Sequence, residues 1–253
     1  MNNDYIRSLI EKGKRIDDRK LDEFRKIVIE TNVSKNSAGS ARCKIGETEV
    51  IVGVKFDIGE PYPDSPGEGT IIVTAELIPV ANPDFELGPP GSKATELARI
   101  VDRGIRESEC IDFRKLCVKE GEKVWMVFID IYPLNDDGNL IDASVLASLK
   151  ALSEAKFPKI VNDKVDHESK TNVGLKLSKL PITTTIYKIN NNLIVDVNNK
   201  EEEVIDARLS VSVADGNIHA MQKGGDVPLR FDDINKMIDI AMKKEKELAK
   251  FLK

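Results

Sequence analysis

Residues 123–132, KVWMVFIDIY, restrict the fold more than any other stretch of the chain. The run is almost uninterrupted in its apolar character, yet it is far too short to cross a membrane as a helix. Such a run is typical of a β-strand whose two faces are both buried. It therefore predicts a strand inside a sheet that helices cover on both sides.

The segments around this run alternate between strand-like and helical patterns. An amphipathic helix is predicted at the start, with Ile6, Leu9 and Ile10 on one side. Strands are predicted at 26–31, 41–45, 49–56 and 70–79, interrupted by Pro- and Gly-rich loops at 57–69 and 79–92. Helices are predicted at 93–108, with Ser92 as the N-cap, and at 142–156 after a turn at 135–139.

The second half repeats this style after a largely polar segment, 153–175, which is predicted to begin a linker. Strands are predicted at 182–189, 193–197, 208–213 and 217–222. Asp215-Gly216 predicts a type I′ hairpin between the last two. A final helix is predicted from about Asp233, with an apolar stripe made of Ile234, Met237, Ile238 and Ala241.

Groups of strands followed by helices predict a mixed α/β (α+β) fold of two related halves, with mixed sheets covered by helices. The expected divisions are an N-terminal helix and arm (1–24), a first half (25–157) and a second half ending in a long helix (158–253), all in one compact unit. No internal sequence repeat accompanies the two halves.

Composition excludes several classes of function. The formal net charge of −5 gives no general attraction to nucleic acid, so such contact needs a local basic patch. The only histidines are His167 and His219, and the three cysteines form no CxxC pair, so neither a Ser-His-Asp mechanism nor a zinc site is expected. We expect no cofactor and no metal. The charged start predicts no signal peptide, and with reduced thiols at Cys43, Cys110 and Cys117 this predicts a cytoplasmic protein.

The predicted helix at 93–108 carries three arginines on one side. Arg99, Arg103 and Arg106 are spaced i, i+4, i+7, and they lie roughly opposite an apolar stripe formed by Ala94, Leu97, Ala98, Val101 and Ile105. The row spans roughly 10 Å at 1.5 Å per residue, which is close to the spacing of two successive phosphates in an extended strand.

Two interpretations of this arginine row remain open on helix geometry alone. In the first, it is a solvated helix face whose charges are neutralised by Glu96, Asp102 and Glu107. In the second, the guanidinium groups contact phosphates of a nucleic acid, for which their forked geometry is suited.

Clustered carboxylates just before the strand at 208–213 raise a similar question. Glu201, Glu202, Glu203 and Asp206 either hold a metal for phosphate chemistry or form a solvated turn.

Several stretches, in this order, resemble the RNase PH family, and most closely the non-catalytic RNase PH-type ring subunit of the archaeal exosome. They are GKRIDDRKLD at 13–22, AGSARCKIGETEV at 38–50, GVKFDIGEPYPD at 53–64 and ELARIVDRGIRES at 96–108. The resemblance runs from about residue 10 to the last helix. It implies phosphorolysis, in which inorganic phosphate attacks the last phosphodiester at an RNA 3′ end and releases a nucleoside diphosphate.

Active family members have Gly-Gly-Thr-Arg after a strand to cradle phosphate, and a pair of aspartates where a metal can be held. Here Gly138 matches the first glycine, but Asn139, Leu140 and Ile141 replace the rest. Glu202 and Arg208 stand at the aspartate positions. A guanidinium there repels a cation. The resemblance therefore implies a chain that does not itself cleave RNA, and Glu201, Glu202 and Glu203 are interpreted as a solvated turn.

The resemblance also implies partners. Three heterodimers with a catalytic RNase PH-type subunit form a hexameric ring, trimeric RNA-binding cap proteins sit on it, and single-stranded RNA is threaded through it. It assigns Arg99, Arg103 and Arg106 to RNA binding. Two alternatives remain: an active exoribonuclease that uses Glu202, Glu203 and Asp206, and a pure scaffold without RNA contact.

Overall fold

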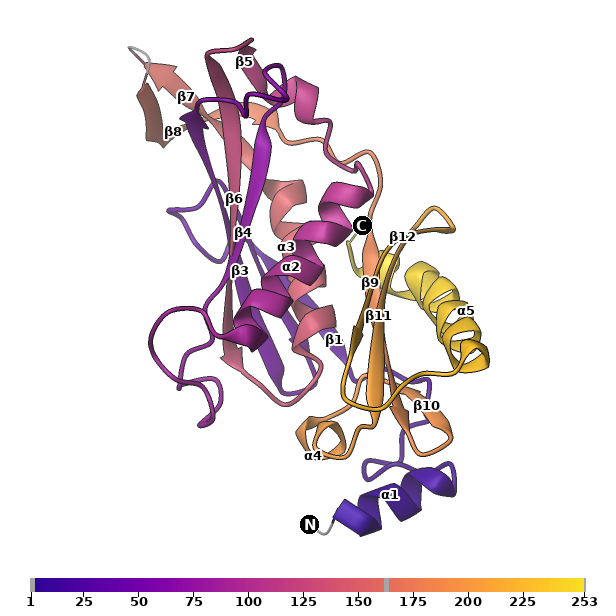
Figure 1. Ribbon diagram of the computed structural model, residues 1–253. Helices are drawn as coiled ribbons and strands as arrows, with labels where there is room; N and C mark the ends of the chain where they lie inside the picture. Colours follow the sequence, from indigo (N-terminus) through magenta and orange to yellow (C-terminus); the bar gives the residue numbers. More distant parts are fainter. Residues whose placement is uncertain (1–2, 162–163, 253) are drawn as a thin grey trace.

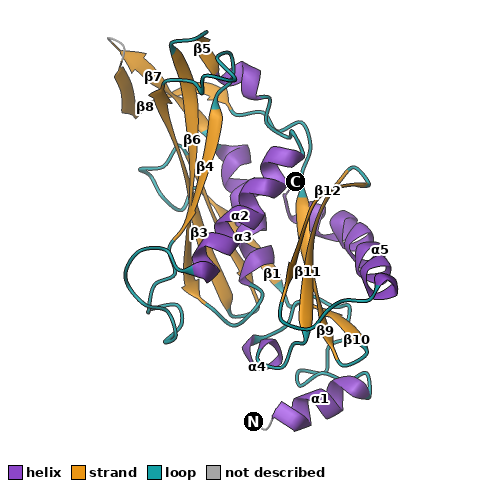
Figure 2. Ribbon diagram, in the orientation of Figure 1, coloured by secondary structure: helices purple, strands orange, loops and turns teal. Residues whose placement is uncertain are grey.

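The computed structural model describes residues 3–161 and 164–252 and confirms the mixed α/β fold class (Figures 1 and 2). The larger sheet has the order β1-β2-β3-β6-β4, with β5 also paired to β6, and only the β4–β6 pair is parallel. Its elements and the helices between them are β1 (Ile27–Thr31), β2 (Gly39–Ile45), β3 (Thr48–Gly59), β4 (Thr70–Ala75), α2 (Ser92–Glu107), η1 (Phe113–Leu116), β5 (Cys117–Lys119), β6 (Lys123–Asn135) and α3 (Leu140–Glu154).

The smaller sheet is antiparallel throughout and has the order β10-β9-β11-β12. Its elements and the remaining helices are α1 (Asn3–Glu11), β9 (Ile182–Ile189), β10 (Asn192–Val195), α4 (Asn199–Glu202), β11 (Ala207–Ala214), β12 (Asn217–Gly224), α5 (Phe231–Leu248) and η2 (Ala249–Leu252). Asp215 and Gly216 both have positive φ, 50° and 75°, which confirms the predicted type I′ turn between β11 and β12.

Helices α2 and α3 lie between the two sheets, and α5 covers the opposite face of the smaller sheet (Figure 1). This central position explains the composition of α3, LIDASVLASLKALSE, in which apolar and small residues occur all round the helix and most are buried. Trp125 is buried in the same core, as its apolar surroundings in the sequence predict. Within the described residues, no helix is both long and apolar enough to span a membrane.

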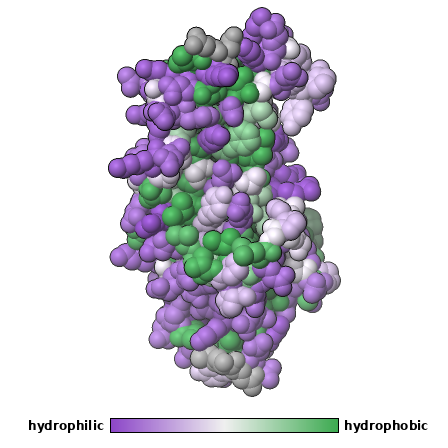
Figure 3. All heavy atoms as spheres, turned by 90° about the vertical axis from the view of Figure 1, so that its left-hand side faces the viewer, coloured by the Kyte–Doolittle hydropathy of each residue, from purple (hydrophilic) through white to green (hydrophobic). Residues whose placement is uncertain are grey.

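The prediction that residues 123–132 are covered on both faces is wrong. Strand β6 alternates: Val127, Ile129 and Ile131 are buried against the helices, whereas Met126 and Phe128 on the other face are only half-buried. Hydrophobic areas are visible on this side of the molecule among polar margins (Figure 3). The reason is that β6 is antiparallel to β3, and antiparallel sheets need cover on one face only.

The prediction that 153–175 begins a linker is also wrong. After α3 ends, the chain forms a hairpin of β7 (Lys156–Val161) and β8 (Lys164–Gly174). Phe157 anchors it, because its ring stacks on Phe56 at 4.4 Å and lies 5.5 Å from Trp125. Polar composition concealed this contact, which joins the hairpin to the core of the first half.

The expected N-cap of α2 is wrong as well. The helix begins at Ser92, one residue earlier than predicted, and the capping position belongs to Gly91, which offers no side-chain hydrogen bond. The first turn of α2 therefore keeps backbone N–H groups without a side-chain cap.

Candidate functional site

The turn that leads into α3 is the one that the resemblance matches to the phosphate cradle of active family members, and here it packs closely against another segment of the chain. Gly138 has φ of 79°, and a Cβ atom at this position would lie 2.6 Å from the carbonyl oxygen of Val197. The backbone of the turn is thus pressed against the segment that follows β10. Leu140 and Ile141 follow it and bring only apolar side chains.

A carboxylate of the chain occupies the start of α3. The N–H of Asn139 donates to Oε2 of Glu202 at 3.2 Å, so a negative group sits where the positive end of the helix favours an anion. Burial raises the pKa of Glu202 and the charge of Asp136 adds to this, whereas the Asn139 N–H and the guanidinium of Arg208 oppose it. Bound phosphate would have to displace this group.

Arg208 lies beside this carboxylate and is held by an acid from α2. Its Nη2 atom donates to Oε2 of Glu96 at 2.6 Å. The two positions that the resemblance aligns with the aspartates of active family members thus carry a carboxylate bound to a backbone N–H and a guanidinium. This arrangement does not fit a divalent cation, because the guanidinium of Arg208 puts a fixed positive charge beside the carboxylates of Glu202 and Glu96.

The interpretation of the three glutamates as one solvated turn is wrong. Only Glu203 is exposed, whereas Glu201 is fully buried and receives hydrogen bonds from the guanidinium of Arg15 on both carboxylate oxygens. Arg15 also donates to the carbonyl oxygens of Val195, at 3.0 Å, and Asp196, at 2.7 Å. The pair fastens the N-terminal arm to the smaller sheet.

Asp206 is directed away from Glu202. Its carboxylate accepts hydrogen bonds from the N–H of Asn190 at 2.6 Å and from Arg7 of α1 at 3.0 Å. Glu202, Glu203 and Asp206 therefore have separate surroundings and do not converge on a metal or a reacting phosphate.

A buried polar network around Asn139 joins the two halves of the chain. Asn139 donates from Nδ2 to Asp196 at 3.0 Å and to Asp142 at 3.3 Å, and Asp196 receives Nη2 of Arg25 at 2.8 Å. Asp142 also accepts the N–H of Thr185 at 2.9 Å, which ties α3 to β9. No local sequence pattern marks these residues, because their partners lie far apart along the chain.

We expect Asp142→Asn to change how stability depends on pH. Burial raises the pKa of Asp142 to about 7 in the folded chain, against a reference value of 3.8. Because the folded state binds its proton more tightly, wild-type stability falls relative to the variant as pH rises from about 4 to about 7, by at most about 4 kcal/mol. Urea unfolding of both proteins across this range measures the difference. A constant difference across this range would contradict the assignment.

The three arginines of α2 have different surroundings. Arg106 is committed to the protein, since its guanidinium pairs with Asp102 at 2.7 Å and donates to the carbonyl oxygen of Ile71 at 3.0 Å. Arg103 is exposed and only reaches Glu107 at 4.0 Å. Arg99 is exposed and makes no ion pair or hydrogen bond with the residues that the structure describes. Neutralisation by neighbouring acids thus applies fully to Arg106 only.

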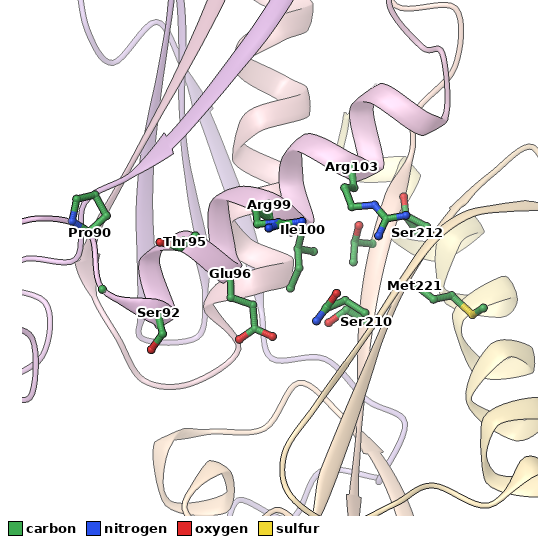
Figure 4. A pocket seen from close by; sticks show the side chains of 14 residues that line it. Pro90, Ser92, Thr95, Glu96, Arg99, Ile100, Arg103, Ser210, Ser212 and Met221 are labelled. Atoms are coloured by element: carbon green, nitrogen blue, oxygen red, sulfur yellow. The ribbon is translucent and has the colours of Figure 1, made fainter.

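Arg99 and Arg103 border a pocket between α2 and the strands of the smaller sheet (Figure 4). Its volume is 540 Å³, within the range of about 300–1,000 Å³ that small-molecule sites occupy. Glu96 also lines it, but its carboxylate is paired with Arg208. The two arginines therefore leave the rim of the pocket positive.

Both halves of the chain match models of one known protein family. The 3′ exoribonuclease family, RNase PH type, matches with its domain 1 over residues 23–158 and with its domain 2 over residues 179–244. The chain belongs to the RNase PH family. The resemblance predicted from the sequence is confirmed.

Individual relatives and solved structures show which members of the family the chain is similar to. The chain is 45% identical to the exosome complex component Rrp42 of Methanothermobacter thermautotrophicus, over 98% of this chain and 92% of that protein. It is 47% identical to Rrp42 of Methanosarcina acetivorans, over 97% and 91%. An Archaeoglobus fulgidus exosome with RNA bound to the active site contains a chain that superposes with a TM-score of 0.91 at 44% identity, covering 99% of this chain and 97% of that one. Rice Rrp46, at 16% identity and a TM-score of 0.71, shares the fold.

Proposed function

We propose that the chain is a non-catalytic ring subunit of an RNA-degrading exosome. It pairs with a catalytic RNase PH-type subunit, three such pairs form the ring with its trimeric RNA-binding cap, and Arg99 and Arg103 hold phosphates of the single-stranded substrate. The similarity to Rrp42 and to archaeal exosome structures supports this assembly. The cysteines of the described chain are free thiols, which supports a reducing compartment such as the cytoplasm.

One observation carries the non-catalytic assignment. The carboxylate of Glu202 binds the N–H of Asn139 at the start of α3, the place where phosphorolysis needs inorganic phosphate. A carboxylate and a phosphate bound together at this helix end would repel each other. At the second position the side chain of Arg208 is a guanidinium, which cannot serve as a metal ligand. RNA binding falls to the free arginines, about 6 Å apart along the helix axis at 1.5 Å per residue.

The isolated full-length chain is expected to release no nucleoside diphosphate from a uniformly labelled RNA in the presence of inorganic phosphate. The same chain mixed with the catalytic partner should give phosphate-dependent release, and omission of phosphate is the control. Chromatography of the products and the mass of the complex measure both halves of the claim. Robust release by the chain alone, free of partner, would overturn it.

Glu202→Gln separates this proposal from an active enzyme that uses Glu202. The amide still accepts the Asn139 hydrogen bond but has no charge, so we expect turnover by the reconstituted complex to stay within about twofold of wild type. A loss of roughly 100-fold or more, the size expected when a general acid or base is removed, would favour the enzyme.

A further inference from the structure

The pocket between α2 and the smaller sheet holds two buried hydroxyl groups without a partner. Oγ1 of Thr183 on β9 and Oγ of Ser212 on β11 line the pocket and make no hydrogen bond within the described residues. The two side chains are 1% and 2% exposed, and their residues are paired directly across the strands. A buried hydroxyl without a partner costs stability, so this pair points to a ligand or solvent in the pocket.

Helix α2 passes directly over this pair at Gly104. A Cβ atom at Gly104 would lie 3.1 Å from Oγ of Ser212 and 3.5 Å from Oγ1 of Thr183. Even the methyl group of alanine would crowd the Ser212 hydroxyl, whereas it would make an ordinary van der Waals contact with Thr183. Gly104 therefore preserves space at the point where polar groups are unsatisfied.

The remaining walls divide into a charged side and an apolar side. Arg99 and Arg103 extend from α2 over the cavity, and Figure 4 shows Arg103 directed toward the strands that carry Ser212 and Met221. Ile100 of α2 and Met221 of β12 line the pocket with apolar side chains from its two sides. Gln222 of β12 adds an amide group. The pocket thus combines guanidinium groups for an anion, hydroxyls for a sugar or base edge, and apolar contacts for a planar ring.

We infer that this pocket binds one phosphorylated nucleoside, with its phosphate on Arg99 and Arg103 and its sugar or base edge on Thr183 and Ser212. The nucleoside is either a free nucleotide or one residue of an RNA strand. The site belongs to this chain and needs no residue of a catalytic partner. It shares its arginines with the proposed RNA contact, so the hydroxyl pair provides the independent test.

The experiment uses the full-length chain alone, titrated calorimetrically with ADP, adenosine, inorganic phosphate and a short single-stranded RNA. The test variant is Thr183→Val/Ser212→Ala, which removes both hydroxyls at nearly constant shape. Thr184→Val is the matched control, because Thr184 also carries a buried, unpaired hydroxyl but its side chain points to the opposite face of the sheet. Circular dichroism checks that all three proteins are folded.

We expect ADP to bind more tightly than adenosine or phosphate. Thr183→Val/Ser212→Ala should weaken ADP binding by about tenfold, because each lost neutral hydrogen bond costs about threefold in affinity. Thr184→Val should leave the affinity unchanged. If only the RNA binds, and the double variant weakens it equally, the occupant is a residue of the strand. The proposed site is wrong if neither ADP nor RNA binds, or if both bind the double variant as tightly as wild type. Either result leaves the partner-dependent phosphorolysis test of the proposed function unaffected.

Discussion

Replacement of Arg15 by methionine is expected to lower the free energy of unfolding by about 3–5 kcal/mol, the cost of leaving one member of a buried ion pair unpaired. Arg15 and Glu201 are both fully buried, and the guanidinium also binds backbone oxygens of Val195 and Asp196. Methionine fills much of the volume but donates no hydrogen bond. Urea or thermal unfolding of the full chain measures the loss.

An exposed arginine provides the control. The side chain of Arg114 is 85% exposed and pairs with Glu68 at 3.3 Å, so Arg114→Met should cost no more than about 1 kcal/mol. Arg15→Met/Glu201→Leu removes both buried charges and should recover part of the stability lost in the single variant. Equal stabilities of Arg15→Met and Arg114→Met would show that the buried pair does not fasten the arm.

Arg99→Glu/Arg103→Glu is expected to weaken binding of single-stranded RNA to the reconstituted complex by roughly 10- to 100-fold while the ring still assembles. Both side chains are exposed and held by no close acid, so their reversal leaves the fold intact. If each arginine neutralises one phosphate, the slope of log affinity against log salt should fall by about 1.4. Anisotropy titrations at several salt concentrations measure both quantities.

The charge-matched control for this experiment lies on the other side of the smaller sheet. Lys243 and Lys246 are exposed on α5, across the sheet from α2 (Figure 1). Lys243→Glu/Lys246→Glu changes the net charge equally and should leave RNA affinity near wild type. If both variants weaken RNA binding equally, the cause is general charge repulsion. If neither weakens it, the chain acts as a pure scaffold. Crosslinking of an oligonucleotide to α2 distinguishes a scaffold from a subunit that contacts RNA.

The acidic cluster shows where local sequence misled. The three consecutive glutamates are chemically identical but have different surroundings. Glu201 forms a buried ion pair, Glu202 accepts a hydrogen bond at the start of α3, and Glu203 faces solvent. Their partners, Arg15 and Asn139, are remote in sequence. No pattern over neighbouring residues could assign these roles.

The arginine row is a similar case. Spacing alone placed Arg99, Arg103 and Arg106 on one stripe, and α2 does present them from one helix. Only the packing of α2 against β4 gave Arg106 a carbonyl oxygen at Ile71 and removed it from the pocket. Within the described residues, Arg99 has no acid partner and Arg103 reaches only Glu107 at 4.0 Å, because the smaller sheet offers no acid to either.

The sequence by itself determined the alternation of strands and helices, the I′ hairpin, the existence of the strand at 123–132 and the family, because periodicity and turn chemistry are local. It also exposed the replaced cradle at Asn139 and the guanidinium at Arg208. Only the tertiary structure decided that Glu202 accepts the N–H of Asn139 at the start of α3, that Phe157 anchors a hairpin, and that Thr183 and Ser212 line a pocket. The physical reason is that burial and electrostatic partnership arise between elements that are brought together by folding, and local pattern carries no record of them.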